Sequence, residues 1–501
     1  MCQHKLGVAT SLQGKIFTGA GWILGWRMAT RGLGLVSTLV LVRLLLPEDF
    51  GLIALAVGFT QVVESLSFLG VEDALVREHN PSRGLYDTAF TLNLLRGLAV
   101  AAALAALAQP IAEWFVEPRL TAVIYALSAG AAINGLRNVG LVEFRRDFAF
   151  QREFASMILP RAVSVVLMII TAVIWQSYWA LVVGVLVTQF SLVALSYRMH
   201  PYRPRLSLSA WGELIGYSLW SWIIAVAVMV RERSPALMIG NVLGTVQVGV
   251  YSVGADLAAL PTSELVEPLS RAAFSGFSSA RNMDAPAAEV YQRTVATMAL
   301  LTLPAGVGTS LIADPLVRLA YGPNWVAAIP LVEVLAITGA ATVFGYIGWT
   351  LFSAYGLLRT IFAVTVTAAA TRILLLIVLL PWIGVVGAAV AVTASIFVED
   401  VLYIGLTFRR FGGRALELLA QIWRGLLAVA CMAVVLVQAG LGWTPAIGGP
   451  AALAMRLTAA VVLGSAVYVG VLLLAWIASG WPPGAEANGI AILTRFRRRI
   501  L

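Results

Sequence analysis

The chain has 501 residues, of which 60% are hydrophobic and only 12% are charged, and its formal net charge is +9. Ordinary soluble domains carry roughly 25% charged residues, so this composition excludes a soluble globular protein and indicates an integral membrane protein. The apolar residues suffice for about fourteen spans and leave little chain for a soluble domain. The two cysteines, Cys2 and Cys431, lie at opposite ends of the chain and predict neither a disulfide framework nor a metal site.

Apolar runs separated by polar breaks predict an all-α polytopic membrane protein with about fourteen transmembrane helices. In chain order the predicted helices are 17–44, 50–69, 88–108, 120–139, 155–174, 179–197, 213–243, 248–267, 293–313, 327–352, 359–380, 384–406, 419–439 and 453–476. The first run begins near Ile16, is longer than a signal-peptide core and lacks a small-residue cleavage site. It therefore predicts a helix that is retained.

The arginines orient these helices. Loops on the side of the N-terminus carry most of them, for example Arg145, Arg205 and Arg410, whereas the opposite loops carry few. Because basic loops stay on the cytoplasmic side, both termini are predicted to be cytoplasmic. This topology and the anionic inner leaflet explain the positive net charge, so no nucleic-acid partner is expected.

The sequence also repeats weakly. An ungapped shift of 198 residues pairs Trp22 with Trp220, Leu45 with Leu243 and Gly51 with Gly249. Parallel repeats of six helices are typical of transporters whose two lobes move around a site near the membrane midplane. We predict two pseudo-symmetric six-helix lobes plus two C-terminal helices. The three parts are residues 1–208, residues 209–415, and residues 416–501 with helices 13 and 14 and a basic cytoplasmic tail.

The stretch AVMVRERSPALMIG, residues 225–238, puts charges inside a predicted span. A charged side chain at the bilayer centre costs about 2.5 to 3.5 kcal/mol on insertion scales, so such residues face the protein interior and mark functional sites. Further arginines lie in predicted helices 1, 5 and 11. The predicted substrate-binding residues are Arg27, Arg31, Arg161, Arg231, Arg233 and Arg372.

These arginines predict an anionic, phosphate-bearing substrate, because the guanidinium fork binds phosphate oxygens bidentately and stays charged. Arg231 and Arg233 are about 200° apart around a helix, unless Pro235 distorts the turn. We expect Arg231 to face a central cavity and Arg233 to pair with a carboxylate such as Glu232 or Asp256. The alternative is that the arginines form internal ion pairs or extend to the membrane interface.

Two carboxylates inside apolar helices, Asp256 and Glu399, are the predicted ion-coupling residues. A role as the charge partner of a cavity arginine stays open for both. The GxxxxGK[ST] phosphate loop is absent from the sequence, so ATP bound by this chain is not expected to supply energy, and no cofactor or metal is predicted.

Residues 25–78, GWRMATRGLGLVSTLVLVRLLLPEDFGLIALAVGFTQVVESLSFLGVEDALVRE, resemble the N-terminal part of the Wzx-type oligosaccharide flippases. These are polysaccharide biosynthesis transporters within the multidrug/oligosaccharidyl-lipid/polysaccharide exporter superfamily. The most specific parts are RLLLPEDFG, residues 43–51, and FRRDFAFQREF, residues 144–154. The resemblance extends with decreasing clarity over residues 10–415, and the last two helices match by hydropathy alone.

The resemblance implies a flippase of the bacterial inner (cytoplasmic) membrane and not an enzyme. It would move undecaprenyl-diphosphate-linked oligosaccharide to the periplasmic leaflet by alternating access, for exopolysaccharide, capsule or lipopolysaccharide assembly. The polyprenyl-diphosphate-linked oligosaccharide and the lipid bilayer would be its partners. The polysaccharide polymerase and glycosyltransferases of the same pathway are further candidate partners.

Three alternatives remain at this stage. A multidrug cation antiporter of the same fold would be expected to place carboxylates and aromatic residues, rather than arginines, at the midplane. A lipid II flippase also uses a cationic cavity and differs only in its substrate. A membrane-embedded polysaccharide polymerase would need a large periplasmic loop, and an acyltransferase would need a histidine in the membrane, but His4, His79 and His200 lie in predicted cytoplasmic segments.

Overall fold

The computed structural model describes residues 25, 28–67, 71, 75–76, 81–147, 149–214, 219–283 and 286–482. Most of these residues are helical and none of them belongs to a β-strand, which confirms the predicted all-α fold. The chain forms two compact units, Met1–Trp222 and Ile223–Leu501. The predicted division into 1–208, 209–415 and 416–501 stays a prediction.

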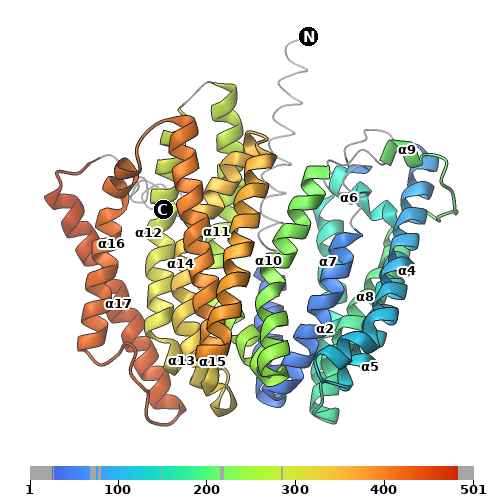
Figure 1. The fold of residues 1–501 in the computed structure, drawn as a ribbon, viewed down its shortest axis with the longest axis horizontal. Coiled ribbons are helices and arrows are strands. Elements are labelled where there is room, and N and C mark those ends of the chain that lie inside the picture. The colour runs from blue at the N-terminus through green and yellow to red at the C-terminus, as the bar shows by residue number, and fades with distance from the viewer. Residues whose placement is uncertain are drawn as a thin grey trace. The chain divides into compact units, whose positions relative to one another are not determined.

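The first unit consists of helices joined by short connections (Figure 1). Residues 28–44 are helical. The elements that follow are α2 (Pro47–Leu66), α4 (Arg83–Trp114), α5 (Arg119–Gly135), η1 (Val139–Leu141), α6 (Val142–Arg146), α7 (Phe150–Trp175), α8 (Trp179–Met199) and α9 (Trp211–Leu214). Helix α4 packs along α5, α7 packs along α8, and α5 also contacts α2 and α8.

The start of α2 lies in the RLLLPEDFG motif. Pro47 occupies the first turn, where a missing N–H costs nothing and the fixed backbone angle suits a helix. The Asp49 carboxylate accepts a hydrogen bond from the Leu46 N–H at 3.0 Å through one oxygen and from the Tyr178 N–H at 3.2 Å through the other. The motif therefore caps α2 and ties it to the turn before α8.

The same motif also reaches α5. Glu48 forms an ion pair with Arg119, the first residue of α5, and Arg119 binds Glu117 at 2.8 Å as well. An isolated exposed ion pair contributes little, but a guanidinium shared by two carboxylates fixes the ends of two helices relative to each other. RLLLPEDFG thus holds together the starts of α2, α5 and α8.

The second unit contains most of α10 and all later elements (Figure 1). They are α10 (Leu219–Leu243), α11 (Thr245–Asn282), α12 (Ala287–Leu311), α13 (Ala313–Ala320), η2 (Pro323–Ala328), α14 (Ile329–Ala354), α15 (Leu358–Phe411), α16 (Ala415–Gln438) and α17 (Pro450–Ala478). Helix α14 packs against α11, α12 and α15, and α16 packs on both α12 and α17.

Helix α15 is broken in its middle. Ile383 and Gly384 leave the helical conformation, and Gly384 has a φ of +62°, which glycine adopts without the strain that other residues incur. The break lies between the predicted spans 359–380 and 384–406. The 54 residues of α15 are therefore two helices, each long enough to cross a bilayer.

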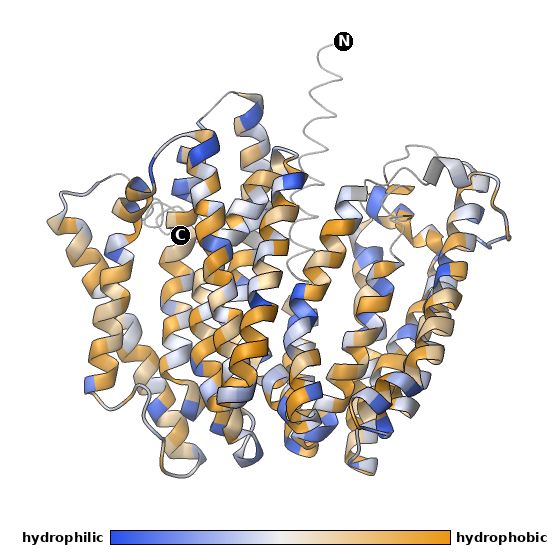
Figure 2. Cartoon of the chain, in the orientation of Figure 1, coloured by the Kyte–Doolittle hydropathy of each residue, from blue (hydrophilic) through white to orange (hydrophobic). Residues whose placement is uncertain are grey.

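Within the described ranges, nine helices are long and apolar enough to cross a membrane, or ten if the bent pair Arg119–Gly135 and Val139–Arg146 is one span. Apolar residues cover most of the length of these helices (Figure 2). The predicted count of about fourteen is higher than nine because it divides α15 and also includes α5, α10, α11 and the start of the chain. That count stays a prediction.

Candidate functional site

Arg231 lies at the RERSP interruption of α10 and is held by two carboxylates. It forms an ion pair with Glu399 of α15, and its Nε donates a hydrogen bond to Glu232 Oε1 at 3.2 Å. The side chains of Arg231 and Glu399 are 14% and 12% exposed, so water screens their attraction only weakly. A predicted substrate-binding residue and a predicted ion-coupling residue are thus in direct contact.

Arg372, in the first half of α15, is almost completely buried at 2% exposure. Its Nε donates to Ser395 Oγ at 2.9 Å, and its Nη1 lies 3.6 Å from Glu232 Oε1. A buried charge persists only where partners replace water, and here a hydroxyl and a carboxylate do so. Because Ser395 belongs to the second half of α15, Arg372 also ties the two halves of α15 together.

Pro235 explains the third partner of Arg372. In an α-helix the carbonyl of residue 231 accepts from the N–H of residue 235, but proline has no N–H. The Arg231 carbonyl instead accepts from Arg372 Nη1 at 3.0 Å and from Ser234 Oγ at 3.0 Å. The proline in RERSP therefore creates a buried acceptor inside α10 that a guanidinium from α15 occupies.

The expected pairing of Arg233 with a carboxylate stays a prediction. Glu232, one of its two expected partners, pairs with Arg231 and Arg372, because Arg372 enters the turn that Pro235 opens. The Nε of Arg233 is buried and has no hydrogen-bond partner within the described part of the chain. The other expected partner, Asp256, is exposed on α11.

In the first unit the structure brings two predicted arginines to one helix face. Arg161 follows Pro160 in α7, and its Nη2 lies 3.6 Å from the position that a Cβ on Gly34 would take. Arg31 is exposed and lies three residues before Gly34, on the same face of the helix. Arg27, the remaining predicted arginine, lies outside the described residues.

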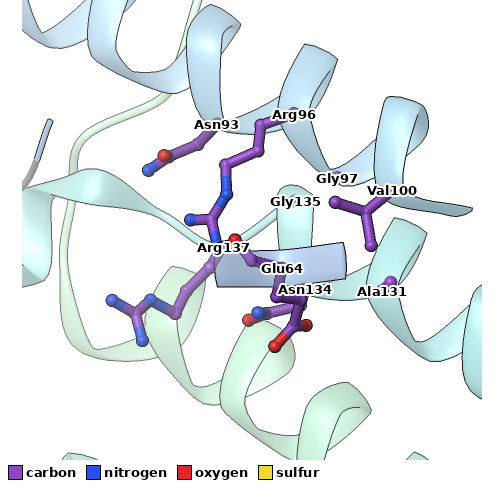
Figure 3. Close-up of a pocket in the computed structure, with 9 residues that line it drawn as sticks. All are labelled: Glu64, Asn93, Arg96, Gly97, Val100, Ala131, Asn134, Gly135 and Arg137. Carbon is purple, nitrogen blue, oxygen red and sulfur yellow. Dashed lines mark hydrogen bonds between the residues drawn. The ribbon is translucent and has the colours of Figure 1, made fainter. Parts of the chain in front are cut away.

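The first unit also contains a polar pocket of about 80 Å³ that the sequence did not predict (Figure 3). Its lining residues are Glu64, Asn93, Arg96, Gly97, Val100, Ala131, Asn134, Gly135 and Arg137. Arg96 donates from Nε to Ser67 Oγ at 3.2 Å and so binds the end of α2. A Cβ on Gly97 would lie 2.8 Å from the Cα of Gly135, so these glycines let α4 and α5 approach closely. Gly97 and Gly135 were the sequence feature that could have indicated this close helix contact.

A second polar cluster that the sequence did not predict fastens the segment after α8 to the first unit. Tyr202 donates to Asp87 at 2.6 Å, and His200 shares a 2.9 Å hydrogen bond with Glu143, which also accepts from Tyr86 at 2.7 Å. Burial and the hydrogen bond to Asp87 raise the pKa of the Tyr202 phenol above its usual range, so the phenol stays protonated. His200 is thus a structural residue here.

The second unit contains an apolar cavity of about 430 Å³ between α11, α12, α16 and α17. Its lining includes Leu300, Leu301, Pro304, Met432, Leu436 and Val461. Such a surface favours hydrocarbon over sugar or phosphate, because burying an unpaired polar group is costly.

Comparisons with known proteins agree with this fold. Residues 40–330 match the family described as "Polysaccharide biosynthesis protein". The succinoglycan biosynthesis transport protein ExoT of Rhizobium meliloti is 23% identical over 326 residues, which are 64% of this chain and 65% of ExoT. The lipopolysaccharide biosynthesis protein WzxC of Escherichia coli is 22% identical over 337 residues, 66% of this chain and 68% of WzxC.

Among solved structures, the lipid II flippase MurJ in an inward closed conformation has a TM-score of 0.74 at 12% identity. The superposition covers 91% of this chain and 99% of MurJ, so the two chains share a fold. The segment matched by ExoT covers less than two thirds of ExoT. The family match covers more than half of the present chain. The chain therefore belongs to the polysaccharide biosynthesis protein family.

Proposed function

We propose that this protein flips an undecaprenyl-diphosphate-linked oligosaccharide across the bacterial inner membrane for exopolysaccharide, capsule or lipopolysaccharide assembly. Both termini are cytoplasmic in this proposal, and the substrate moves to the periplasmic leaflet. The names of ExoT, WzxC and MurJ, which refer to succinoglycan transport, lipopolysaccharide biosynthesis and lipid II flipping, support the substrate class.

The observation that carries the proposal is the arginine cluster between α10 and α15. Arg231 pairs with Glu232 and Glu399, and Arg372 pairs with Glu232, while Arg233 lies in the same turns of α10. The cluster places three guanidinium groups inside largely apolar helices, where a phosphate would be attracted strongly. The planar guanidinium suits the diphosphate of a lipid carrier.

The lipid part of the substrate has its own support in the second unit. The apolar cavity between α11, α12, α16 and α17 has the lining that a hydrocarbon chain requires. The diphosphate of the substrate would then bind at Arg231, and its isoprenoid chain would occupy the apolar cavity.

Transport follows an alternating-access cycle in this proposal, with Arg27, Arg31 and Arg161 contributing from the first unit. Arg231 must exchange Glu399 for a substrate phosphate when the substrate binds. The affinity of Arg231 for the phosphate must also differ between the inward-facing and outward-facing states, because a substrate bound equally well in both states shifts no equilibrium. Glu399 and Asp256 are the candidate groups through which an ion gradient drives the cycle.

A multidrug cation antiporter is disfavoured, because Arg231 and Arg372 would repel a cationic drug from this site. A lipid II flippase would need the same diphosphate recognition and differs only in the sugar and peptide that the carrier bears. A transport assay that offers the polysaccharide-pathway substrate and the peptidoglycan substrate in turn distinguishes these two functions.

The test compares Arg231→Ala and Arg31→Ala in cells whose surface polysaccharide depends on this protein. We expect export to stop while the amount of protein in the membrane stays normal, and Arg231→Lys to restore export only partly. Arg293→Ala is the matched control, because Arg293 is 71% exposed at the start of α12. Normal export in the alanine variants, or loss of the proteins from the membrane, would overturn the proposal.

A further inference from the structure

Asp400 stands next to Glu399 in α15 but has entirely different surroundings. It is 4% exposed, and its Oδ1 accepts a hydrogen bond from the Gly345 N–H of α14 at 2.7 Å. Its Oδ2 is buried and has no hydrogen-bond partner among the residues that the structure describes. An ionised carboxylate in this position would leave a charged oxygen without water or a donor, which is strongly unfavourable.

The space around this carboxyl is formed by specific neighbours. A Cβ on Gly345 would lie 2.6 Å from Asp400 Oδ1, so only a glycine lets the carboxyl reach the backbone of α14. On α12, the Tyr291 hydroxyl donates to the Phe344 carbonyl at 3.1 Å. The peptide unit between Phe344 and Gly345 therefore binds a phenol through its oxygen and the Asp400 carboxyl through its nitrogen.

Few charged or titratable groups face Asp400, and none is a cation bound to it. Tyr291 approaches from α12, and α14 contributes the Gly345 backbone N–H. Within α15, Glu399 and Tyr403 both come within 3.7 Å of a Cβ on Gly345. Arg231 of α10 is bound to Glu399, and Asp400 forms no ion pair with the residues that the structure describes. A second negative charge beside Glu399 would be unfavourable here.

We propose that Asp400 is a proton-binding site of this transporter. Asp400 is a neutral carboxylic acid in the described state, with its proton on Oδ2. It exchanges that proton with water when α14 and α15 separate enough to admit water. Deprotonation breaks the carboxyl O–H bond and forms an O–H bond of hydronium, and protonation is the reverse.

The role of this proton in transport rests on the proposed function. Loss of the proton places a second negative charge next to Glu399, so the attraction of Arg231 for a substrate phosphate weakens. Protonation removes that charge and strengthens phosphate binding. By linkage, a bound phosphate raises the proton affinity of Asp400 to the same extent. The proton site and the phosphate site are thus coupled through Glu399.

The first test needs no substrate. Infrared spectra of the purified protein in lipid bilayers should contain the carbonyl band of a buried, protonated carboxylic acid, and this band should decrease as the pH rises. It should be absent from Asp400→Asn, an uncharged variant of the same shape, and present in Glu289→Gln, which changes an exposed carboxylate on α12. Absence of the band from the unmodified protein at neutral pH, or its persistence in Asp400→Asn, would overturn the assignment.

The second test measures binding of farnesyl diphosphate, a soluble polyprenyl diphosphate, at low and high pH. Deprotonation of Asp400 should weaken binding by about tenfold. Asp400→Asn should lack this pH-dependent loss of affinity. The ligand itself ionises in the same way in both measurements, so the difference between the two proteins reports on Asp400. Equal pH dependence in both proteins would overturn the coupling. If Arg231→Ala binds the probe normally, the proposed function fails, whereas the infrared result still decides the proton site.

Discussion

Arg372 donates a hydrogen bond from Nη1 to the carbonyl oxygen of Arg231, the acceptor that Pro235 leaves without its helical donor. One residue of RERSP therefore depends on a side chain that lies 141 positions further along the chain. The interruption of α10 and the buried arginine of α15 form one structural feature, and their energies should not be independent.

The first prediction concerns this dependence. Arg372→Met should lower stability by about 3 to 5 kcal/mol, because it leaves the Glu232 carboxylate and the Arg231 carbonyl short of a donor. Pro235→Ala supplies the missing N–H, so the same substitution should cost less in that background, by about 0.5 to 3 kcal/mol. Thermal unfolding of the four detergent-purified proteins measures the difference. Strictly additive effects would show that the proline and the arginine act separately.

A second prediction separates a structural ion pair from a substrate-binding arginine. Arg231→Glu and Glu399→Arg each place like charges opposite one another, and both should lower stability. Combining them reverses the pair and should restore stability. Export should remain defective, because the guanidinium has moved from α10 to α15. Surface polysaccharide and melting temperature are measured together. Restored export in the double variant would mean that the pair serves only the fold.

The third prediction concerns the cap of α2. Asp49→Ala removes the acceptor for the Leu46 and Tyr178 N–H groups and should cost about 1 to 2 kcal/mol. Glu113→Ala is the control, because the Glu113 carboxylate is exposed and binds only Gln109 nearby; its effect should stay within about 0.5 kcal/mol. Melting temperatures of the two purified variants test this. Equal melting temperatures would contradict the capping role.

Local features were predictable because they are set by neighbouring residues. The apolar runs predicted the helices, and the boundary between the predicted spans 359–380 and 384–406 lies at the interruption of α15. The charges of RERSP correctly pointed to an interior position, since Arg231 is mostly buried. In each case the signal lies within one turn or one span of sequence.

Contacts between distant helices were not predictable in the same way, because they depend on how each helix is rotated and placed along its axis. Glu399 and Asp400 are adjacent and equally acidic, yet one binds Arg231 and the other binds the backbone at Gly345. Adjacent residues differ by about 100° around a helix, so a small error in rotation exchanges their roles. The sequence named Glu399 as a candidate and gave no reason to select Asp400.

The ties from Glu48 and Asp49 to Arg119 and Tyr178 have a consequence for recognising such chains. The RLLLPEDFG stretch, by which this protein most readily resembles a flippase, joins three helix ends through Glu48 and Asp49. A search built on that stretch will gather chains that share this scaffold, whatever they carry. Distinguishing them by cargo requires comparing the residues at positions such as 231, 372 and 399. These positions contact one another only in the folded protein, where α10 and α15 pack together.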